Sequence, residues 1–214
     1  SIPTRRSSDL EDNLEFSHEI FGEKFFNTKI KINRLSDVYD ILPMTVSERL
    51  IEELDFKNNK FVTVSGQLRS YNKNVGEKNK LILTVFVREI KPKEEENKDP
   101  NSIFLDGYIC KRPVYRKTPL GREITDLLVA INRPYNKSDY IPSIVWGRNA
   151  KFARNLNVGD RIQIWGRIQS RFYEKKIDEE TTVKKVAYEV SVSKIKKVDR
   201  KSTRLNSSHI TISY

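Results

Sequence analysis

The stretch INRPYNKSDYIPSIVWGRNAKFARNLNVGDRIQIWGRIQSRFYEKK, residues 131–176, decides the fold that we expect. Its middle part, NAKFARNL, has the apolar spacing of a short helix, and the turn NVGD ends that helix. The part that follows, RIQIWGRIQSRFY, alternates apolar and polar residues as a half-buried strand does. Gly166 within it permits a bend where a barrel turns a corner. A strand, a short helix and a long strand are therefore predicted in this order.

Apolar runs on either side of this stretch predict the other strands. IFLDGYIC (103–110) predicts a first strand, and the loop RPVYRKTPLG, with two prolines, separates it from the next run. Further strands are predicted in EITDLLVAIN (123–132), YIPSIVW (140–146) and KKVAYEVSVSKI (184–195), the last after the polar loop EKKIDEETTV. Three strands, a helix and two strands are the order of the OB-fold, a five-stranded Greek-key barrel that commonly binds oligonucleotides.

Aromatic and basic residues alternate along residues 131–176. A protein that grips unpaired nucleic acid needs flat side chains on which bases stack and cations that follow the phosphates. The alternative is that the rings are core residues, because strands favour aromatic side chains in any case. The rings are Tyr135, Tyr140, Trp146, Phe172 and Tyr173, and the cations are Arg133, Lys137, Arg148, Lys151, Arg154, Arg167, Arg171, Lys175 and Lys176.

An ordered series of motifs in residues 102–198 resembles one family, the bacterial single-stranded DNA-binding proteins. It consists of the D-G-Y turn of the first strand, R-K-T-P-L-G-R-E-I, A-I-N-R-P-Y, D-Y-I-P-S-I-V-W-G-R, V-G-D-R-I-Q-I-W-G-R-I-Q-S-R-F-Y and V-A-Y-E-V-S-V. No single motif would suffice, but their order is specific.

The resemblance implies which residues meet nucleic acid. The base-stacking positions of the family fall at Tyr135, Tyr140, Trp146 and Tyr173, where the family often has tryptophan or phenylalanine in place of tyrosine. Phosphate contacts are expected from Arg133, Arg148, Lys151 and Arg171.

The resemblance also implies the partners. It implies that the chain binds single-stranded DNA and protects it in replication, recombination and repair, in the cytoplasm and associated with the nucleoid. The family usually gathers four OB barrels, and chains with two barrels do so as dimers, so a homodimer is expected. Family members commonly end in an acidic tip that recruits replication and repair enzymes, and no such tip is visible here.

An internal repeat extends the OB pattern to the first half. VSERLIEELDFKNNKFVTVSGQLRS (46–70) is in step with WGRNAKFARNLNVGDRIQIWGRIQS (146–170) at an offset of one hundred, which aligns Gly66 with Gly166. At this offset Trp146 meets Val46, Tyr140 meets Asp40, and Tyr135 lies near Leu35, so the aromatic series is largely absent from the first half. We therefore expect an all-β chain of two tandem OB barrels, each with a short helix between its third and fourth strands.

The basic charge lies in the second half. Residues 1–100 carry 17 Lys and Arg against 18 Asp and Glu, whereas residues 101–200 carry 21 against 11, within a chain of net charge +11. A concentrated basic excess is typical of a polyanion binder, although basic surfaces also serve solubility. We assign most nucleic-acid contact to the second barrel, and to the first a supporting, dimerising or weak-binding role.

The expected domains are a first OB-like domain at 11–90, a linker at 91–101 and a second OB domain at 102–198. No apolar strand precedes LEFSHEIFGEKFF, so the first barrel is expected to lack its first strand. Residues 1–10 and 200–214 resemble translated adapter sequence, and an ordinary disordered tail is the alternative. A non-native or disordered tail is predicted at both ends.

Residues for catalysis are scarce. His18, His209 and Cys110 supply no metal-ligand spacing, and Cys110 on a predicted strand is expected to be a small core residue. Phosphate-loop and dinucleotide motifs are missing, and scattered carboxylates, Asp106, Glu123, Asp126 and Asp139, have no nuclease spacing. We predict neither enzymatic activity nor a cofactor. No apolar run is long enough to span a bilayer, so no membrane partner is predicted. The alternative functions are a single-stranded RNA-binding OB protein and a primosome-type assembly scaffold.

Overall fold

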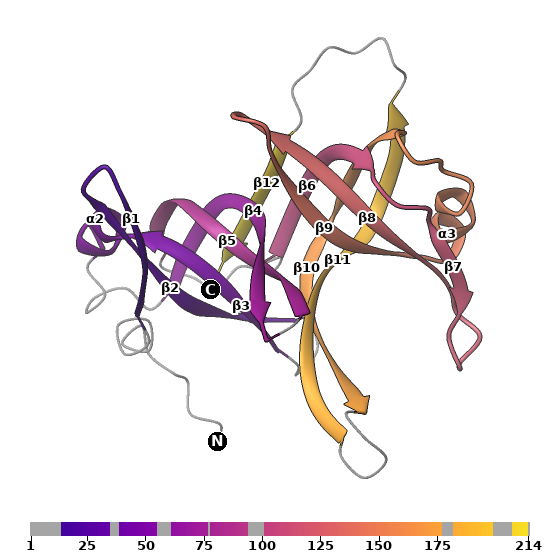
Figure 1. The fold of residues 1–214 in the computed structure, drawn as a ribbon, viewed down its shortest axis with the longest axis horizontal. Coiled ribbons are helices and arrows are strands. Elements are labelled where there is room, and N and C mark those ends of the chain that lie inside the picture. The colour runs from indigo at the N-terminus through magenta and orange to yellow at the C-terminus, as the bar shows by residue number, and fades with distance from the viewer. Residues whose placement is uncertain are drawn as a thin grey trace. The chain divides into compact units, whose positions relative to one another are not determined.

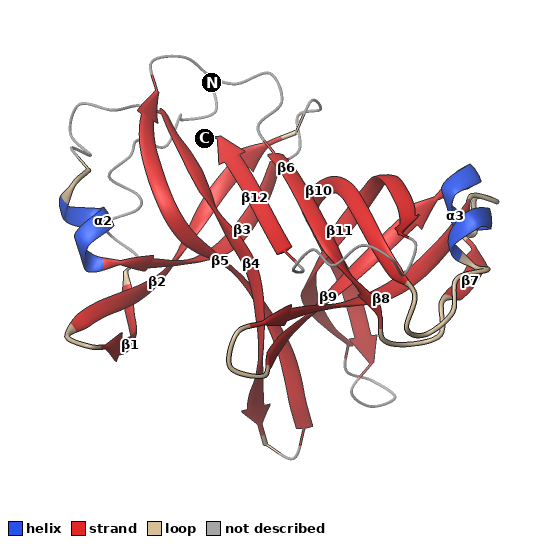
Figure 2. Cartoon of the chain, turned by 90° about the horizontal axis from the view of Figure 1, so that it is seen from above, coloured by secondary structure: helices blue, strands red, loops and turns tan. Residues whose placement is uncertain are grey.

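The computed structural model describes residues 14–34, 39–54, 61–76, 78–93, 101–176, 182–198 and 207–213. The chain divides into two compact units, the first formed by Ser1–Ser102 with His209–Tyr214 and the second by Ile103–Ser208. Figure 1 labels their elements. In both units strands make up nearly all of the described regular structure, as Figure 2 shows.

The second unit closes its strands into a barrel. The strand order is β6-β10-β11-β9-β8-β7, and a further pairing of β6 with β8 closes a ring of five strands, with β7 outside it. Among the described strands of this unit, only β9 and β11 pair in parallel. The elements are β6 (Asn101–Ile109), β7 (Val114–Lys117), β8 (Glu123–Arg133), β9 (Lys137–Trp146), α3 (Gly147–Ala153), β10 (Arg161–Lys176) and β11 (Thr182–Val198).

Apolar side chains at alternate positions of β10 fill the interior of this barrel. Ile162, Ile164 and Ile168 are buried, as their period of two residues predicts. At Gly166 the pairing with β11 shifts by one residue, and a Cβ atom on Gly166 would lie 2.1 Å from the carbonyl oxygen of Ser191. The predicted bend is therefore a β-bulge at which only glycine lets the two backbones approach.

One strand of the second unit lies in a predicted loop. β7 occupies part of RPVYRKTPLG and pairs with the start of β8. Its sequence, VYRK, is four residues long and half basic, so it contains no apolar alternation that predicts a strand.

The first unit has the same order of strands in its sheet, but β12, which takes the place of β6, comes last in the chain. Its strand order is β1-β2-β3-β5-β4-β12, with β3 and β5 parallel. The side chain of Ser47 caps α2 by accepting a hydrogen bond from the Leu50 N–H. The elements are β1 (Glu15–Ile20), β2 (Glu23–Asn33), β3 (Tyr39–Ser47), α2 (Glu48–Glu52), β4 (Phe61–Val75), β5 (Lys78–Lys93) and β12 (Ser207–Ser213).

The predicted repeat is confirmed along β4 and β10. Gly66 sits at a bulge like that of Gly166, and a Cβ atom on it would lie 2.2 Å from the carbonyl oxygen of Phe86. Val62, Val64 and Leu68 are buried, like the isoleucines one hundred residues later. The chain therefore folds as two tandem OB barrels.

Along β3 and β9, the predicted offset is wrong by one residue. Thr45 lies opposite Phe86 as Ile144 lies opposite Ser191, which makes the offset 99. The connection through α3 is one residue longer than the connection through α2, and this extra residue restores the offset of one hundred at the bulge glycines.

The shift changes the counterparts of the aromatic residues. Trp146 corresponds to Ser47 rather than Val46, and Tyr140 corresponds to Ile41 rather than Asp40. Leu35, near which Tyr135 was expected to fall, lies outside the described residues.

Part of the segment predicted to be a non-native or disordered tail forms a strand. Residues 207–213 form β12, which pairs antiparallel with β4, because the segment HITIS alternates apolar and polar side chains and buries both isoleucines. Residues 1–13 and 199–206 lie outside the described part of the chain.

The predicted linker lies mostly outside the described residues. β5 extends to Lys93 and β6 begins at Asn101, which leaves 94–100 between them. None of the helices in the described part of the chain has the length and apolar character that crossing a membrane requires.

Candidate nucleic-acid interface

Two of the predicted rings lie on the outer side of β9. Ile141, Ser143 and Val145 face the core and are buried. The alternate positions point to the other side of the strand, where Ile144 is covered at 4% exposure, but Tyr140 is 41% exposed and Trp146 is 36% exposed. These two rings therefore share one face of the sheet.

The same face continues across β11 to β10. Ile144 of β9 lies opposite Ser191, and Ser191 lies opposite Arg167 of β10. Residues opposite one another in paired strands point to the same side, as do residues two apart along a strand. Arg171 and Tyr173 therefore join Arg167 on this side. We call the set Tyr140, Trp146, Arg167, Arg171 and Tyr173 the outer face of the second barrel.

Arg171 and Tyr173 lie where β10 and β11 extend as a long hairpin arm (Figure 1). The Arg171 guanidinium lies 5.9 Å from the centre of the Tyr173 ring, a cation–π arrangement. Arg171 also pairs with Glu189 at 3.3 Å, and this buried carboxylate accepts a hydrogen bond from Gln169. Arg171 is thus held in place while half of its side chain stays exposed.

Phe172 projects from the opposite side of the same arm and is 73% exposed. The side chains of Lys175 and Lys176, further along the arm, lie outside the described part of the structure. The arm therefore carries exposed rings on both of its sides.

Tyr135 lies at the tip of the β8–β9 hairpin. It is 95% exposed, and both Tyr135 and Asn136 have positive φ, 62° and 55°. Such a turn favours glycine or asparagine, so a tyrosine here is not explained by turn geometry or by packing. The ring is presented to solvent next to the strand that carries Tyr140.

Arg133 has a structural partner. Its Nε lies 2.8 Å from an oxygen of Asp139, whose side chain is 1% exposed. The first unit repeats the pair, because Arg34 donates two hydrogen bonds of 2.7 Å to Asp40, which is buried to the same degree. The pair braces the hairpin between the second and third barrel strands in each unit, and any phosphate contact of Arg133 would share the guanidinium with Asp139.

Lys151 and Arg148 lie on α3. Lys151 pairs with Glu123 at 3.2 Å, and the Tyr115 hydroxyl donates a 2.6 Å hydrogen bond to the same carboxylate. These two hydrogen bonds, that of Tyr115 first, lower the pKa of Glu123. Arg148 is exposed. Near them, the Arg154 guanidinium lies 5.3 Å from the centre of the Tyr115 ring.

Tyr115 and Arg116 were not among the predicted site residues. Both come from β7, which the sequence does not predict as a strand. VYRK contains one aromatic residue followed by two adjacent basic residues, which is not the alternating pattern of residues 131–176, so that pattern did not point to them.

The scattered carboxylates do not assemble into a metal site. Each has a cationic partner, and among the described residues no three His, Cys, Asp or Glu side chains gather to hold a metal ion. The pairs are Asp106 with Arg161 at 2.9 Å, Asp126 with Arg116 at 2.7 Å, Asp139 with Arg133 and Glu123 with Lys151.

Cys110 is half-buried at the end of β6. Its thiol donates a hydrogen bond to the Leu128 carbonyl at 3.2 Å, and burial raises the pKa of Cys110. A thiol with a raised pKa is less often a thiolate and so less nucleophilic at neutral pH.

On the corresponding face of the first barrel, Phe86 is covered by its neighbours, whereas Tyr71, the counterpart of Arg171, is 48% exposed. Phe86, the counterpart of Ser191, stacks on Phe25 with ring centres 5.6 Å apart. The Arg69 guanidinium covers Phe86 at 3.6 Å from the ring centre. The counterparts of Trp146 and Tyr140 are Ser47 and Ile41, so the aromatic series is not repeated here.

Part of this chain matches the model of one protein family. Residues 100–198 match the family model "Single-strand binding protein family". The chain is 37% identical over 83 residues to the single-stranded DNA-binding protein of Clostridium tetani, covering 36% of this chain and 57% of that protein. It is 33% identical over 81 residues to single-stranded DNA-binding protein 3 of Listeria innocua, covering 35% and 51%. The chain thus spans little more than half the length of these relatives.

Solved structures extend the likeness to both units. The wild-type single-stranded DNA binding protein from Thermus aquaticus has a TM-score of 0.65 at 17% identity, over 92% of each chain. A deletion mutant of that protein gives 0.60 at 17% identity, over 91% of this chain and 92% of that one. At this identity the likeness shows the shared two-barrel fold.

Proposed function

We propose that this chain, whose residues 100–198 form a domain of the single-strand binding protein family, binds single-stranded DNA without sequence preference on the outer face of the second barrel. The observation that carries the proposal is the exposure of Tyr140, Trp146 and Tyr173 on one face together with Arg167 and Arg171. Rings in a core would have been buried. The relatives named as single-stranded DNA-binding proteins support the same assignment.

The mechanism is binding without chemistry. Unpaired bases stack on Trp146, Tyr140 and Tyr173, and phosphates run past Arg167 and Arg171. Stacking tolerates every base because each has a flat π-face, and this makes the interface insensitive to sequence. A duplex hides its base faces, so the surface selects separated strands and keeps them from re-annealing.

Three further elements join this path. Tyr135 extends the series of rings at the β8–β9 turn, Arg148 and Lys151 add cations on α3, and Arg133 contacts a phosphate while it keeps its ion pair with Asp139. The hairpin arm of β10 and β11 supplies Phe172 on its other side.

Titration of labelled oligonucleotides tests the proposal. We expect tight binding of a dT oligomer, weak binding of a duplex of the same length, and a loss of affinity for the variant Trp146→Ala. Trp146→Phe is the matched control, because phenylalanine keeps a stacking face. Equal affinity of Trp146→Ala and the wild type would remove Trp146 from the site.

An rU oligomer in the same titration separates single-stranded DNA from RNA as the preferred ligand, because only RNA carries the 2′-hydroxyl. We expect dT to bind more tightly. Binding of rU alone would reassign the chain to the RNA-binding alternative, and defined oligomers without oligonucleotide binding would favour the scaffold.

We also propose that two chains associate, which gathers four OB barrels. Light scattering should then give twice the chain mass of 25.1 kDa. The dimer then coats separated strands during replication, recombination and repair. It does so in the cytoplasm, in association with the nucleoid.

A further inference from the structure

The outermost strands of the two units are structural counterparts. β1 ends the strand order of the first unit, and β7 ends that of the second. Ile32 lies opposite Asp40 as Ile131 lies opposite Asp139, so the offset of 99 residues also relates β2 to β8. β1 pairs with β2 and β7 pairs with β8, each in a hairpin. We call residues 15–24 the first edge hairpin and residues 114–123 the second edge hairpin.

The two edge hairpins carry opposite charge. The first has three Glu against one Lys, a net charge of −2, and the second has three Lys and Arg against one Glu, a net charge of +2. The charged residues are Glu15, Glu19, Glu23 and Lys24 in the first and Arg116, Lys117, Arg122 and Glu123 in the second. The same structural element is therefore acidic in one unit and basic in the other.

One pair of facing positions has its charges exchanged between the units. Glu19 of β1 lies opposite Lys24, whereas Lys117 of β7 lies opposite Glu123. Lys24 and Glu123 are equivalent at the offset of 99, so both positions of this pair reverse their sign. Glu19 and Lys117, which belong to the outermost strands, are exposed. The outermost strands thus present charges of opposite sign to solvent.

Ion pairs inside each unit compensate only part of these charges. Partners in the same unit are found for Glu23, Lys24, Arg116 and Glu123. No ion pair with another described residue is formed by Glu15, Glu19, Lys117 and Arg122. The charge that remains is therefore acidic on the first edge hairpin and basic on the second.

Both outermost strands have an edge along which no described strand lies. Among the strands that the structure describes, β1 pairs with β2 alone and β7 pairs with β8 alone. Such an edge offers backbone N–H and C=O groups to a further strand. Equal charges oppose the pairing of β1 with β1, or of β7 with β7, between two chains. Opposite charges favour the pairing of β1 with β7, so the charges select one combination of edges.

The edge hairpins also expose apolar side chains. Phe21, at the tip of the first, is fully exposed and has a φ of 50°, which a bulky residue rarely adopts. Ile20 beside it is 47% exposed. In the second edge hairpin, Val114 is 57% exposed and Leu120 is 86% exposed. Packing within the units does not account for these side chains, which supply apolar area for a contact between proteins.

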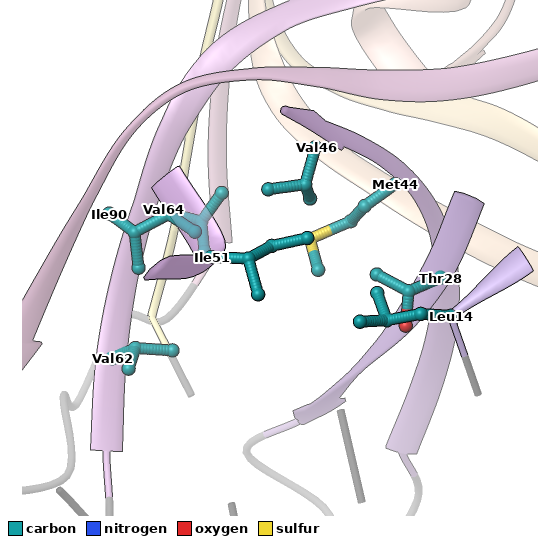
Figure 3. A pocket seen from close by; sticks show the side chains of 8 residues that line it. All are labelled: Leu14, Thr28, Met44, Val46, Ile51, Val62, Val64 and Ile90. Carbon is teal, nitrogen blue, oxygen red and sulfur yellow. The ribbon is translucent and has the colours of Figure 1, made fainter. Parts of the chain in front are cut away.

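The apolar pocket of the first unit does not include the exposed side chains of the first edge hairpin. Figure 3 shows this pocket, whose lining comes from β2, β3, α2, β4 and β5 and from the residue before β1. The pocket residues are Leu14, Thr28, Met44, Val46, Ile51, Val62, Val64 and Ile90. Residues 15–24 are not in this set, so the pocket gives no reason for their exposed apolar side chains.

We propose that the β1 edge of one chain pairs with the β7 edge of a second copy of this chain. Backbone hydrogen bonds and the exposed apolar side chains hold the two edges together, and the charges select them, because exposed ion pairs contribute little alone. Each chain has one edge of each kind, so association continues beyond two chains unless two chains close on each other through both edges. That associated chains follow one another along a coated strand rests on the function proposed above.

Sedimentation velocity of the full chain without nucleic acid tests the proposal. At about 50 mM salt, we expect the sedimentation coefficient of the wild type to rise with protein concentration. In about 1 M salt this rise should be much weaker, because the charges are screened. Glu15→Lys with Glu19→Lys makes both edge hairpins basic, and Lys117→Glu with Arg122→Glu makes both acidic. Either double variant should lower the association constant at least about tenfold.

An equimolar mixture of the two double variants gives the sharpest test. Basic edges of one variant then meet acidic edges of the other, so the sedimentation coefficient of the mixture should rise above that of either variant alone. Both variants keep a net positive charge, because four charge units are added to or removed from a chain of net charge +11. General attraction between the chains therefore does not explain a recovery.

Glu89→Lys with Glu174→Lys is the matched control. These residues of β5 and β10 are exposed, lie outside both edge hairpins, and give the same change of net charge as the first double variant. We expect the control to associate like the wild type. Circular dichroism should be the same for all variants, because every substituted residue is exposed.

Three results would overturn the proposal. The first is a wild type whose sedimentation coefficient does not change with concentration at low salt. The second is a mixture that sediments like its separate components, as expected if β1 and β7 met within one chain. The third is a control that loses as much association as the double variants. Because no nucleic acid is present, none of these results depends on the DNA binding proposed above.

Discussion

At the residue scale, the proposed interface depends most on Trp146. The ring ends β9, precedes α3 and is partly exposed, and nothing in the equivalent position of the first barrel resembles it. Base stacking contributes about 1 to 3 kcal/mol per base, so Trp146→Ala should weaken binding of a dT oligomer by roughly 5- to 150-fold. Fluorescence anisotropy measures the change, and a loss of less than about twofold would contradict the assignment.

Asp139 permits a second prediction at this scale. Replacement by asparagine leaves the Arg133 guanidinium without its counter-charge, and we expect the second unit to lose about 1 to 3 kcal/mol of unfolding free energy, limited by the partial exposure of Arg133. Urea unfolding measures this loss. The control is Asp126→Asn, which breaks an exposed pair with Arg116 and should cost less than about 1 kcal/mol. Equal losses of unfolding free energy in the two variants would show that the buried pair stabilises the unit no more than the exposed pair does.

The rings were predictable at this scale, and the ion pairs were not. Trp146 and Tyr135 stand beside glycine, proline and arginine, where a core aromatic is not expected. The pairing of Arg133 with Asp139 spans a hairpin, and its six-residue spacing acquires meaning only because Arg34 and Asp40 repeat it. The two pairs are 99 residues apart in the sequence, so an alignment at a uniform offset of one hundred did not match them.

At the scale of elements, the alternation of β10 and the bulge at Gly166 followed from the sequence because periodicity and a lone glycine both constrain a strand. β7 did not, because four residues give too little periodicity, and β12 did not, because its residues were assigned to a terminal tail. The pairing of β12 with β4 is also a contact between residues more than one hundred positions apart, which no local pattern encodes.

The pocket of the first unit gives a prediction at this scale. Val62→Ile adds one methylene group at a pocket-lining position where the second barrel has Ile162, so it should stabilise the first unit by about 0.5 to 1 kcal/mol. Thermal unfolding measures the change. Val85→Ile is the control, because Val85 is fully buried and does not line the pocket, so added volume there should destabilise. A lower melting temperature for Val62→Ile would show that the pocket cannot accept it.

At the scale of the whole molecule, the uneven charge predicts how binding responds to salt. Release of counterions gives a slope of log affinity against log salt concentration near −0.7 for each phosphate neutralised on a single strand, so four contacts give about −3. Oligonucleotide titrations between about 50 and 200 mM salt measure this slope. Arg167→Gln and Arg171→Gln together should make it shallower by about 1.4. A flat response in the wild type would contradict a basic path along the second barrel.

The difference between the two barrels was visible in part at this scale. The charge difference and the missing aromatic series led us to propose that the second unit binds the nucleic acid. The sequence could not show that Phe86 of the first unit is covered by Arg69 and Phe25, because that stack joins three strands.

The most direct measurement is tryptophan fluorescence of the Trp165→Phe variant on addition of poly-dT. Trp165 packs against Phe104 with ring centres 5.1 Å apart, so phenylalanine preserves the contact and leaves Trp146 as the sole tryptophan. Stacking of a base on Trp146 predicts strong quenching that saturates with poly-dT and reverses at high salt. Unchanged emission from a protein that anisotropy shows to be bound would contradict an interface built on the outer face of the second barrel.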